Sequence, residues 1–388
     1  MREAAWIAIL TLMTGAACGD ESHSDVQVHV VQQHEIEILA GEAILADAID
    51  VRVDGRYVWA LDSEAPFLTR VNIETGEVQR FGDEGSGPSE LVWPVAIVPD
   101  GEQVIVWDPG ARRVHRFDAE GHHVEATRLD GSWGATTRRD VRHVVEGDPF
   151  RVRRKTDGFV TAIYPGGVNR NRDLNFGFLT STPEVEFGTR FNLGSLSQFA
   201  VRDGDALREL GPVPLWEYCD NELVVWSPAA RAVQWFEAPL PASPAISVPI
   251  SLPRRHLSKA AQLHHLAEMA RLELGPAYEA LDINFEARLQ QLSGAFSNWA
   301  ADVVDVRCGW SGRVWLRLKG NSEETSGAER WRLIEPTGAS LEVRFPRLYR
   351  PLVFYEKAVI GVVQSAAGDA LGTWPGVHLL PIPQSPHP

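Results

Sequence analysis

The sequence has little cysteine, no basic excess and no repetitive tract, and each shortage excludes a class of protein. Only three of its 388 residues are cysteine, too few for a small fold held together by disulfides. The formal net charge of −15 opposes nucleic-acid binding, which needs a basic face. The 33 glycines and 25 prolines are scattered, which excludes a low-complexity tract. From the charge we expect no nucleic-acid partner. The thirteen tryptophans, by contrast, favour pleated sheets, so we expect an all-β fold.

The chain also lacks the spacings that common catalytic and metal sites need. It contains no Gly-x-Ser-x-Gly, no His-Glu-x-x-His and no paired-cysteine zinc spacing. His264 and His265 are adjacent in a helical stretch, and adjacent residues do not share a helix face. The pair His122–His123 falls in a turn, where we expect both rings to be solvated. The sequence therefore predicts no metal, no cofactor and no identifiable catalytic residue.

No segment after the N-terminus has an apolar run long enough to span a membrane. Residues 1–17 instead have the form of a secretory signal: Arg2 precedes an uncharged run from Ala4 to Met13, and small residues follow. We expect an exported protein. Cleavage at an Ala-x-Ala-like site would release it, whereas processing before Cys18 would leave that cysteine as the new N-terminus.

An internal repeat indicates the architecture. Residues 54–62, DGRYVWALD, correspond to residues 100–108, DGEQVIVWD, and the two copies begin 46 positions apart. Each is an Asp-Gly turn and an apolar strand that ends in aspartate, and further strands and a Gly turn follow. Weaker copies begin near residues 157, 219 and 303. This period, with about four strands in each unit, is typical of propeller blades, which bury both sheet faces by stacking around an axis.

The two ends of the chain and one internal segment complete this picture. The C-terminal unit, 358–381, is one strand short, and residues 26–39 alternate like a strand that would complete it. We count six blades, with five as the alternative. Residues 258–292 have helix-forming composition and predict a helical insertion near the fourth blade. The predicted organisation is a signal peptide at 1–17, a tether at 18–25 and one propeller domain at 26–388.

Residues 81–91, FGDEGSGPSEL, carry a family resemblance. They resemble the inter-blade loop Gly-x-Gly-Pro-Gly-Glu-Phe of six-bladed propeller proteins related to NHL repeats, which are common among bacterial lipoproteins. Ser89 and Leu91 depart from the Gly and Phe that are usual there. The good match covers residues 51–128. The resemblance implies a six-bladed propeller and assigns no activity.

Residues 15–18 carry a second resemblance. Gly15-Ala16-Ala17-Cys18 is similar to the lipobox of bacterial lipoproteins, with Gly15 where an aliphatic residue is usual. The polar residues 19–25 that follow suit a tether. This implies lipid attachment at Cys18 and a location in the bacterial cell envelope, facing the periplasm or the cell surface. Secretion without a lipid is the alternative.

Three groups of polar residues are candidate site residues. Asp62 and Asp108 end equivalent strands, where they would either bind a cation at the propeller channel or, as we favour, cap their turns through backbone N–H groups. Cys219 and Cys308 occupy equivalent places in neighbouring repeats, and we expect buried free thiols in preference to a disulfide. A possible anion-binding patch, which we interpret rather as a solvated edge or loop, comprises Arg138, Arg139, Arg142, Arg151, Arg153, Arg154 and Lys155.

The function expected from these observations is binding or scaffolding. The loops at one end of a propeller suit a protein, a peptide or a glycan as partner. We expect a monomer that meets the membrane only through its lipid anchor. The alternative is a lyase or hydrolase that uses acidic or histidine residues at the channel mouth.

Overall fold

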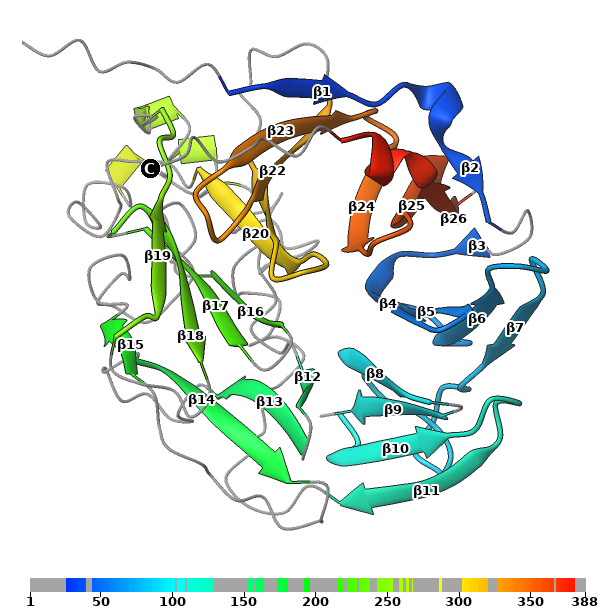
Figure 1. The fold of residues 1–388 in the computed structure, drawn as a ribbon. Coiled ribbons are helices and arrows are strands. Elements are labelled where there is room, and N and C mark those ends of the chain that lie inside the picture. The colour runs from blue at the N-terminus through cyan, green and yellow to red at the C-terminus, as the bar shows by residue number, and fades with distance from the viewer. Residues whose placement is uncertain are drawn as a thin grey trace, which may run out of the picture.

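The computed structural model describes residues 26–128 apart from 40–43, 102 and 109, strands and short stretches between 152 and 319, and residues 327–380 apart from 366–367. Its strands form six sheets arranged in a ring, and all their strands pair antiparallel apart from one added edge strand (Figure 1). The innermost strand of each sheet contacts that of the next sheet, and the last contacts the first. The predicted all-β propeller is confirmed.

The sheets follow one another along the chain, and we number them as blades in that order. Blade one is β4 (Ala48–Asp54), β5 (Tyr57–Asp62), β6 (Leu68–Asn72) and β7 (Val78–Phe81). Blade two is β8 (Ala96–Asp100), β9 (Gln103–Asp108), β10 (Arg113–Phe117) and β11 (His123–Arg128). Blade three is β12 (Val152–Lys155), β13 (Gly158–Ile163), β14 (Asp173–Thr180) and β15 (Asn192–Ser195).

The second half of the chain continues this order. Blade four is β16 (Leu215–Cys219), β17 (Glu222–Ser227), β18 (Ala232–Glu237) and β19 (Ile246–Pro249). Blade five is β20 (Val303–Cys308), β21 (Val314–Leu318), β22 (Glu329–Ile334) and β23 (Ser340–Phe345). Blade six is β24 (Tyr349–Phe354), β25 (Val359–Ser365) and β26 (Gly368–Trp374), followed by the 3-10 helix η4 (Pro375–Leu379).

The side-chain packing is described for five of these six sheets. Five packed blades are therefore shown, where the sequence predicts six. For the sheet β12–β15, the divergent third unit, the strands are described and the burial of their side chains lies outside the description. The other blades bury their apolar residues against their neighbours. Between blades one and two, for example, Trp59 and Leu68 pack with Val106 and Phe117.

The predicted turns form as expected. Gly55 and Gly101 have φ values of +56° and +66° and occupy the β4–β5 and β8–β9 turns. Only glycine adopts this left-handed conformation without a steric cost, which explains the repeated Asp-Gly. The similar stretches 107–117 and 226–236 both form the corner between the second and third strands of a blade, and Arg112 and Arg231 share φ values of +52° and +51°.

The N-terminal segment adds strands to two blades. β2 (Glu37–Ile38) and β3 (Ile44–Leu45) pair antiparallel with β26 and complete blade six, which had been expected to be one strand short. β1 (Val28–Val30) pairs instead with β23 as a parallel fifth strand of blade five. The 3-10 helix η1 (Gln33–Glu35) connects them. The segment therefore spans two blades, where the sequence had indicated one.

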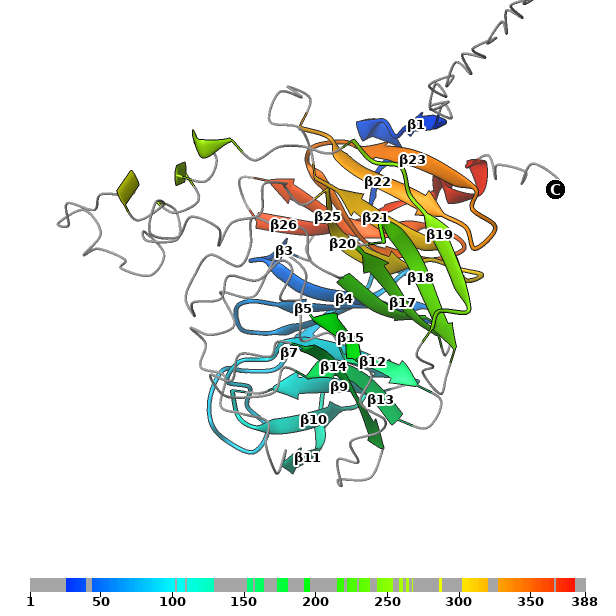
Figure 2. The ribbon, with the colours of Figure 1, turned by 90° about the vertical axis from the view of Figure 1, so that its left-hand side faces the viewer.

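The helical insertion is described in part. Lys259, Ala260, Leu263, His264 and Ala267 are helical, as are Glu286 and Ala287. These residues project from one face of the ring (Figure 2), and Lys259 Nζ lies 3.3 Å from Glu286 Oε1. Apart from Ser258, the rest of 258–292, the signal peptide 1–17 and the tether 18–25 lie outside the described residues. Within the described part of the chain, no helix is long and apolar enough to cross a membrane.

Candidate functional site

The two strand-end aspartates bind backbone N–H groups of their own blades. Asp62 accepts from Ala46 N at 2.8 Å and Asp47 N at 2.9 Å, and also from Ser63 N at 2.7 Å. Ala46 and Asp47 lie 16 and 15 positions before Asp62, in the chain that enters blade one. Because its carboxylate is 1% exposed and accepts three N–H groups, Asp62 fixes the entry of the chain into blade one.

Asp108 repeats this arrangement in blade two. Its carboxylate accepts from Val92 N at 2.7 Å and Trp93 N at 3.0 Å, again 16 and 15 positions earlier, and from Ala111 N at 3.0 Å. The side chain is fully buried. The same hydrogen bonds recur in both blades, as expected of residues that cap a turn. The carboxylate oxygens of Asp62 and Asp108 therefore point toward N–H donors.

Charged pairs on the innermost strands were not found by sequence reasoning. Asp50 on β4 lies 2.8 Å from Arg52 Nη2, and its other oxygen accepts from Ile97 N of blade two at 3.2 Å. Asp305 on β20 accepts from Arg307 Nε and from Val306 N, both at 2.8 Å. The tripeptide Asp-Val-Arg occurs at both places, 50–52 and 305–307, and was the available signal.

A third carboxylate of the inner ring belongs to Glu217 on β16, which is 1% exposed and accepts from Tyr218 N at 3.1 Å. Asp50, Glu217 and Asp305 are all buried acids on innermost strands. Each is held by backbone N–H groups or by an arginine, an arrangement that stabilises contacts within and between blades.

The expectation of two free thiols is wrong. Cys219 ends β16 and Cys308 ends β20, and the two form a disulfide with their Cα atoms 5.6 Å apart. The expectation assumed that equivalent residues of adjacent sheets lie too far apart for a disulfide. On innermost strands the blades converge, and the distance falls within the 4.4–6.8 Å range of disulfides.

The histidines of blade two divide into an exposed and a buried set. His122 is exposed as expected and lies 3.2 Å from Asp118, but His123 is half-buried, contrary to the expected solvated turn. Its Nε2 lies 3.4 Å from Nδ1 of His115, which is fully buried. Burial lowers the pKa of His115 to about 4, although the charge of Asp108 opposes this, and burial also lowers the pKa of His123.

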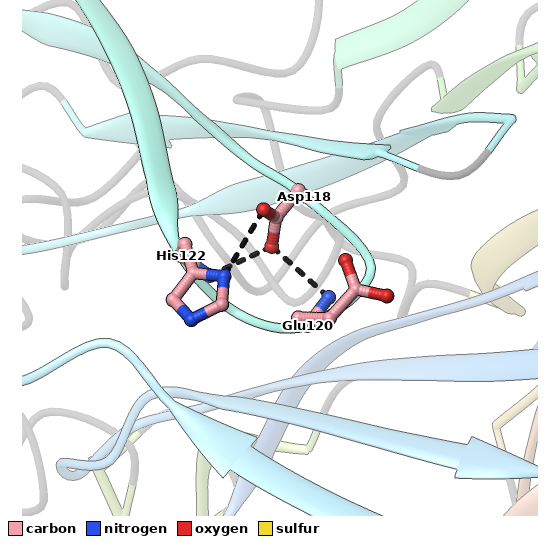
Figure 3. A group of neighbouring side chains, drawn as sticks. All are labelled: Asp118, Glu120 and His122. Atoms are coloured by element: carbon pink, nitrogen blue, oxygen red, sulfur yellow. Dashed lines mark hydrogen bonds and ion pairs between the residues drawn. The ribbon is translucent and has the colours of Figure 1, made fainter.

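Asp118, Glu120 and His122 have ligand atoms within 4.8 Å of one another (Figure 3). They belong to the hairpin turn between β10 and β11, the two outer strands of blade two. Asp118 Oδ1 accepts from Glu120 N at 3.0 Å and His122 N at 2.8 Å. The turn itself accounts for this grouping, because a turn aspartate binds N–H groups two to four positions ahead.

The other candidate residues are only partly described. Arg153, Arg154 and Lys155 lie on β12, whose side chains are outside the described residues, as are Arg138, Arg139, Arg142, Arg151 and Cys18. The glycine-rich loop 82–91 joins β7 to β8. There Leu91 is fully buried, and Arg113 Nη1 donates to Gly87 O at 2.9 Å. This loop therefore connects two blades, as its resemblance implied.

Comparisons with known proteins support the fold. No protein-family model matches the sequence, and no curated protein matches it. A member of the DUF4221 family from Bacteroides vulgatus has a similar structure, with 10% identity, a TM-score of 0.51, and coverage of 87% of this chain and 95% of that one.

Two further solved structures are less similar. A candidate exported protein from Bacteroides fragilis has 11% identity, a TM-score of 0.46, and coverage of 90% and 98%. A virginiamycin B lyase from Staphylococcus aureus has 11% identity, a TM-score of 0.38, and coverage of 87% and 98%. At 10% identity, the DUF4221 structure shows a shared fold alone. The function of this chain must therefore be argued from its own residues.

Proposed function

We propose that this protein is an exported, six-bladed propeller of the NHL-like kind that binds a protein, peptide or glycan, and that Cys18 tethers it to a membrane. In this proposal blade three, formed by β12–β15, is a complete blade and brings the number of complete blades to six. The alternative function is catalysis by acidic or histidine residues at the mouth of the propeller channel.

The state of the inner carboxylates carries the choice of binding over catalysis. A catalytic acid or base must present a titratable group to a substrate. Among the described inner-strand residues, Asp50 and Asp305 instead bind an arginine and backbone N–H groups, and Glu217 is buried. The described trio of possible metal ligands lies on an outer hairpin. This distribution supports a scaffold whose loops carry recognition.

Two features support export. The first 17 residues have the charge and apolar length of a signal peptide. The disulfide between Cys219 and Cys308 is of a kind that persists in oxidising compartments outside the cytoplasm. The cysteine at position 18, followed by seven polar or small residues, supports the tether.

Expression of the full chain with its own leader in a bacterium tests the address. We expect the protein in the membrane fraction, with mass spectrometry showing a lipidated N-terminal Cys18. The Cys18→Ser variant should be exported but soluble. Unlipidated wild-type protein in the medium would contradict the tether and leave the propeller unaffected.

Cross-linking of the tethered protein in cells, followed by reconstitution with the purified partner, tests the binding role. Asp50→Asn is the informative variant, because we assign Asp50 to inter-blade stability. The folded variant should bind the partner as wild type does. If the wild-type protein turns over a substrate, and Asp50→Asn loses that turnover without losing stability, Asp50 would instead belong to an active site.

A further inference from the structure

We propose that Asp47 and Asp369 bind a positively charged side chain, lysine or arginine, of a partner protein or peptide. The proposal rests on the proposed binding function and assigns one contact to it. Asp369 is the second residue of β26 in blade six, and Asp47 directly precedes β4 of blade one. These two blades are neighbours in the ring (Figure 1), and we call the place of the two acids the blade six–one corner.

Strand pairing brings the two acids to this corner. Asp369 is opposite Leu45 of β3, and Leu45 lies two positions before Asp47. Side chains two positions apart on a strand point to the same face. Leu371, two positions after Asp369, packs in the core that blade six shares with blade one. The side chain of Asp369 therefore lies on the face of β26 that is turned toward blade one.

Asp369 is a mostly buried acid without a partner. Its exposed fraction is 9%, and its side chain forms no hydrogen bond or ion pair with any residue that the structure describes. Its two oxygens are not enclosed, however, because neither is among the solvent-inaccessible polar atoms. Burial of a carboxylate without a hydrogen-bond donor is costly. A ligand with a positive charge would offset this cost and can reach both oxygens from solvent.

The charges around Asp369 are mainly negative. Burial raises the pKa of Asp369, and the charges of Asp47 and Asp62 raise it further, although the charge of Arg350 opposes this. Arg350 already has partners, since its Nη2 donates to Asp47 Oδ1 at 3.2 Å and to Ala48 O at 3.1 Å. Three carboxylates and one guanidinium leave two negative charges in excess when the acids are ionised. The corner therefore favours a further cation.

The surface at the corner suits the side chain of another molecule. Asp47 is open, with 66% of its side chain exposed. Leu348 is 50% exposed, and its carbonyl oxygen accepts from Gln364 N at 2.7 Å, while Gln364 is opposite Asp369. An exposed leucine and an unpartnered carboxylate thus lie at the same end of blade six. Lysine and arginine have an apolar stem and a charged head, and so match both.

A side-chain cation fits this corner better than a metal ion does. Calcium takes roughly six to eight oxygen ligands. Asp62, the third acid, already uses both oxygens for backbone N–H groups, which leaves the carboxylates of Asp47 and Asp369. Within the described part of the chain, the three side chains with metal-ligand spacing lie on blade two. The net charge of −15 also attracts a basic protein or peptide from a distance.

Binding of a tetra-arginine peptide to the full mature chain carrying Cys18→Ser, which removes the anchor, tests the proposal. We expect tetra-arginine to bind and the uncharged tetra-citrulline peptide not to bind. Asp369→Asn and Asp47→Asn should each weaken binding about tenfold, because each removes a hydrogen bond between charged groups. Asp83→Asn is the matched control, since it removes one negative charge from an exposed residue elsewhere in the ring.

Thermal unfolding separates a binding role of Asp369 from a structural one. Asp369→Asn should keep or raise the melting temperature, because it removes a buried charge that no described residue binds. Weakened peptide binding at such a melting temperature supports the site. A melting temperature several degrees below that of wild type would show that Asp369 stabilises the fold, and would overturn the proposal.

Three further results distinguish the site from the proposed function. Peptide binding that Asp369→Asn leaves unchanged overturns the site, while a partner recovered by cross-linking would still support the binding function. Calcium binding that requires Asp369 and that tetra-arginine does not displace assigns the corner to a metal ion and overturns the side chain as ligand. Tetra-arginine binding that requires Asp369, with no partner cross-linked in cells, would support the site and contradict the proposed function.

Discussion

Cys219 and Cys308 are 89 positions apart in the chain, and their disulfide joins the innermost strands of blades four and five. Cys219 belongs to the core that the two blades share, and the partly buried Cys308 packs against that core. The bond therefore closes a loop that contains all of blade four beyond β16 and the helical insertion.

Removal of this disulfide should lower stability substantially. A closed loop of this length destabilises the unfolded chain by roughly 4.6 kcal/mol. We expect the Cys219→Ser/Cys308→Ser variant to lose up to that amount of unfolding free energy in urea, and each single variant to lose a similar amount. Reductant should destabilise wild type and leave the double variant unchanged. Wild type that is insensitive to reductant would contradict the bond.

The strand-end aspartates give a paired test. Asp62→Ala and Asp108→Ala each leave three backbone N–H groups without their carboxylate acceptor, which we expect to cost about 2–4 kcal/mol. Asp83→Ala is the control, because Asp83 is exposed. Urea unfolding measures all three. A cation site would instead show itself as calcium-dependent stability that both variants abolish, and such dependence would refute the turn-capping role.

The buried His115 should make the fold acid-sensitive. Its folded-state pKa is lowered to about 4 from 6.5, so the unfolded state takes up the proton first. Its contribution is complete above pH 6.5 and is lost as the pH falls toward 4. Between pH 7 and pH 5 this amounts to about 2 kcal/mol. Urea titrations at these pH values should show the slope in wild type, and His115→Gln should flatten it. An equal slope in the variant would assign the loss to other groups.

The closure of the ring by the N-terminal segment can be tested at one residue of β2 and one residue of β3. Leu45 on β3 is fully buried between blades six and one, whereas Ile38 on β2 is 49% exposed. Leu45→Ala should cost about 2–5 kcal/mol, while Ile38→Ala should change stability by less than about 0.5 kcal/mol. Thermal unfolding distinguishes them. Equal effects would mean that β3 does not seal the ring.

Local signals predicted much of the fold. The Asp-Gly turns at 54–55 and 100–101 require a left-handed glycine, and that need is met within a few residues of the chain. The paired aspartates Asp62 and Asp108 were recognised for the same reason, since each ends a strand at a repeated place. The DVR tripeptides at 50–52 and 305–307 were also readable, but their pairing depends on an innermost strand, which the repeat does not identify.

Other features depend on distances between blades. His123 was expected in solvent because it follows a turn, and it is half-buried because β11 carries it back toward His115. β1 alternates in a way that suits either neighbouring blade, and its choice of β23 follows from the path of the segment around the rim.

The sequence by itself determined an all-β propeller, the turns of its blades and the strand that completes the last one, because short-range backbone preferences repeat along the chain. Only the tertiary structure decided that Cys219 meets Cys308 and that Asp369 of blade six meets the charges of Asp47 and Asp62. Both depend on how closely sheets approach at a given radius of the ring, a distance that no pattern along the chain encodes.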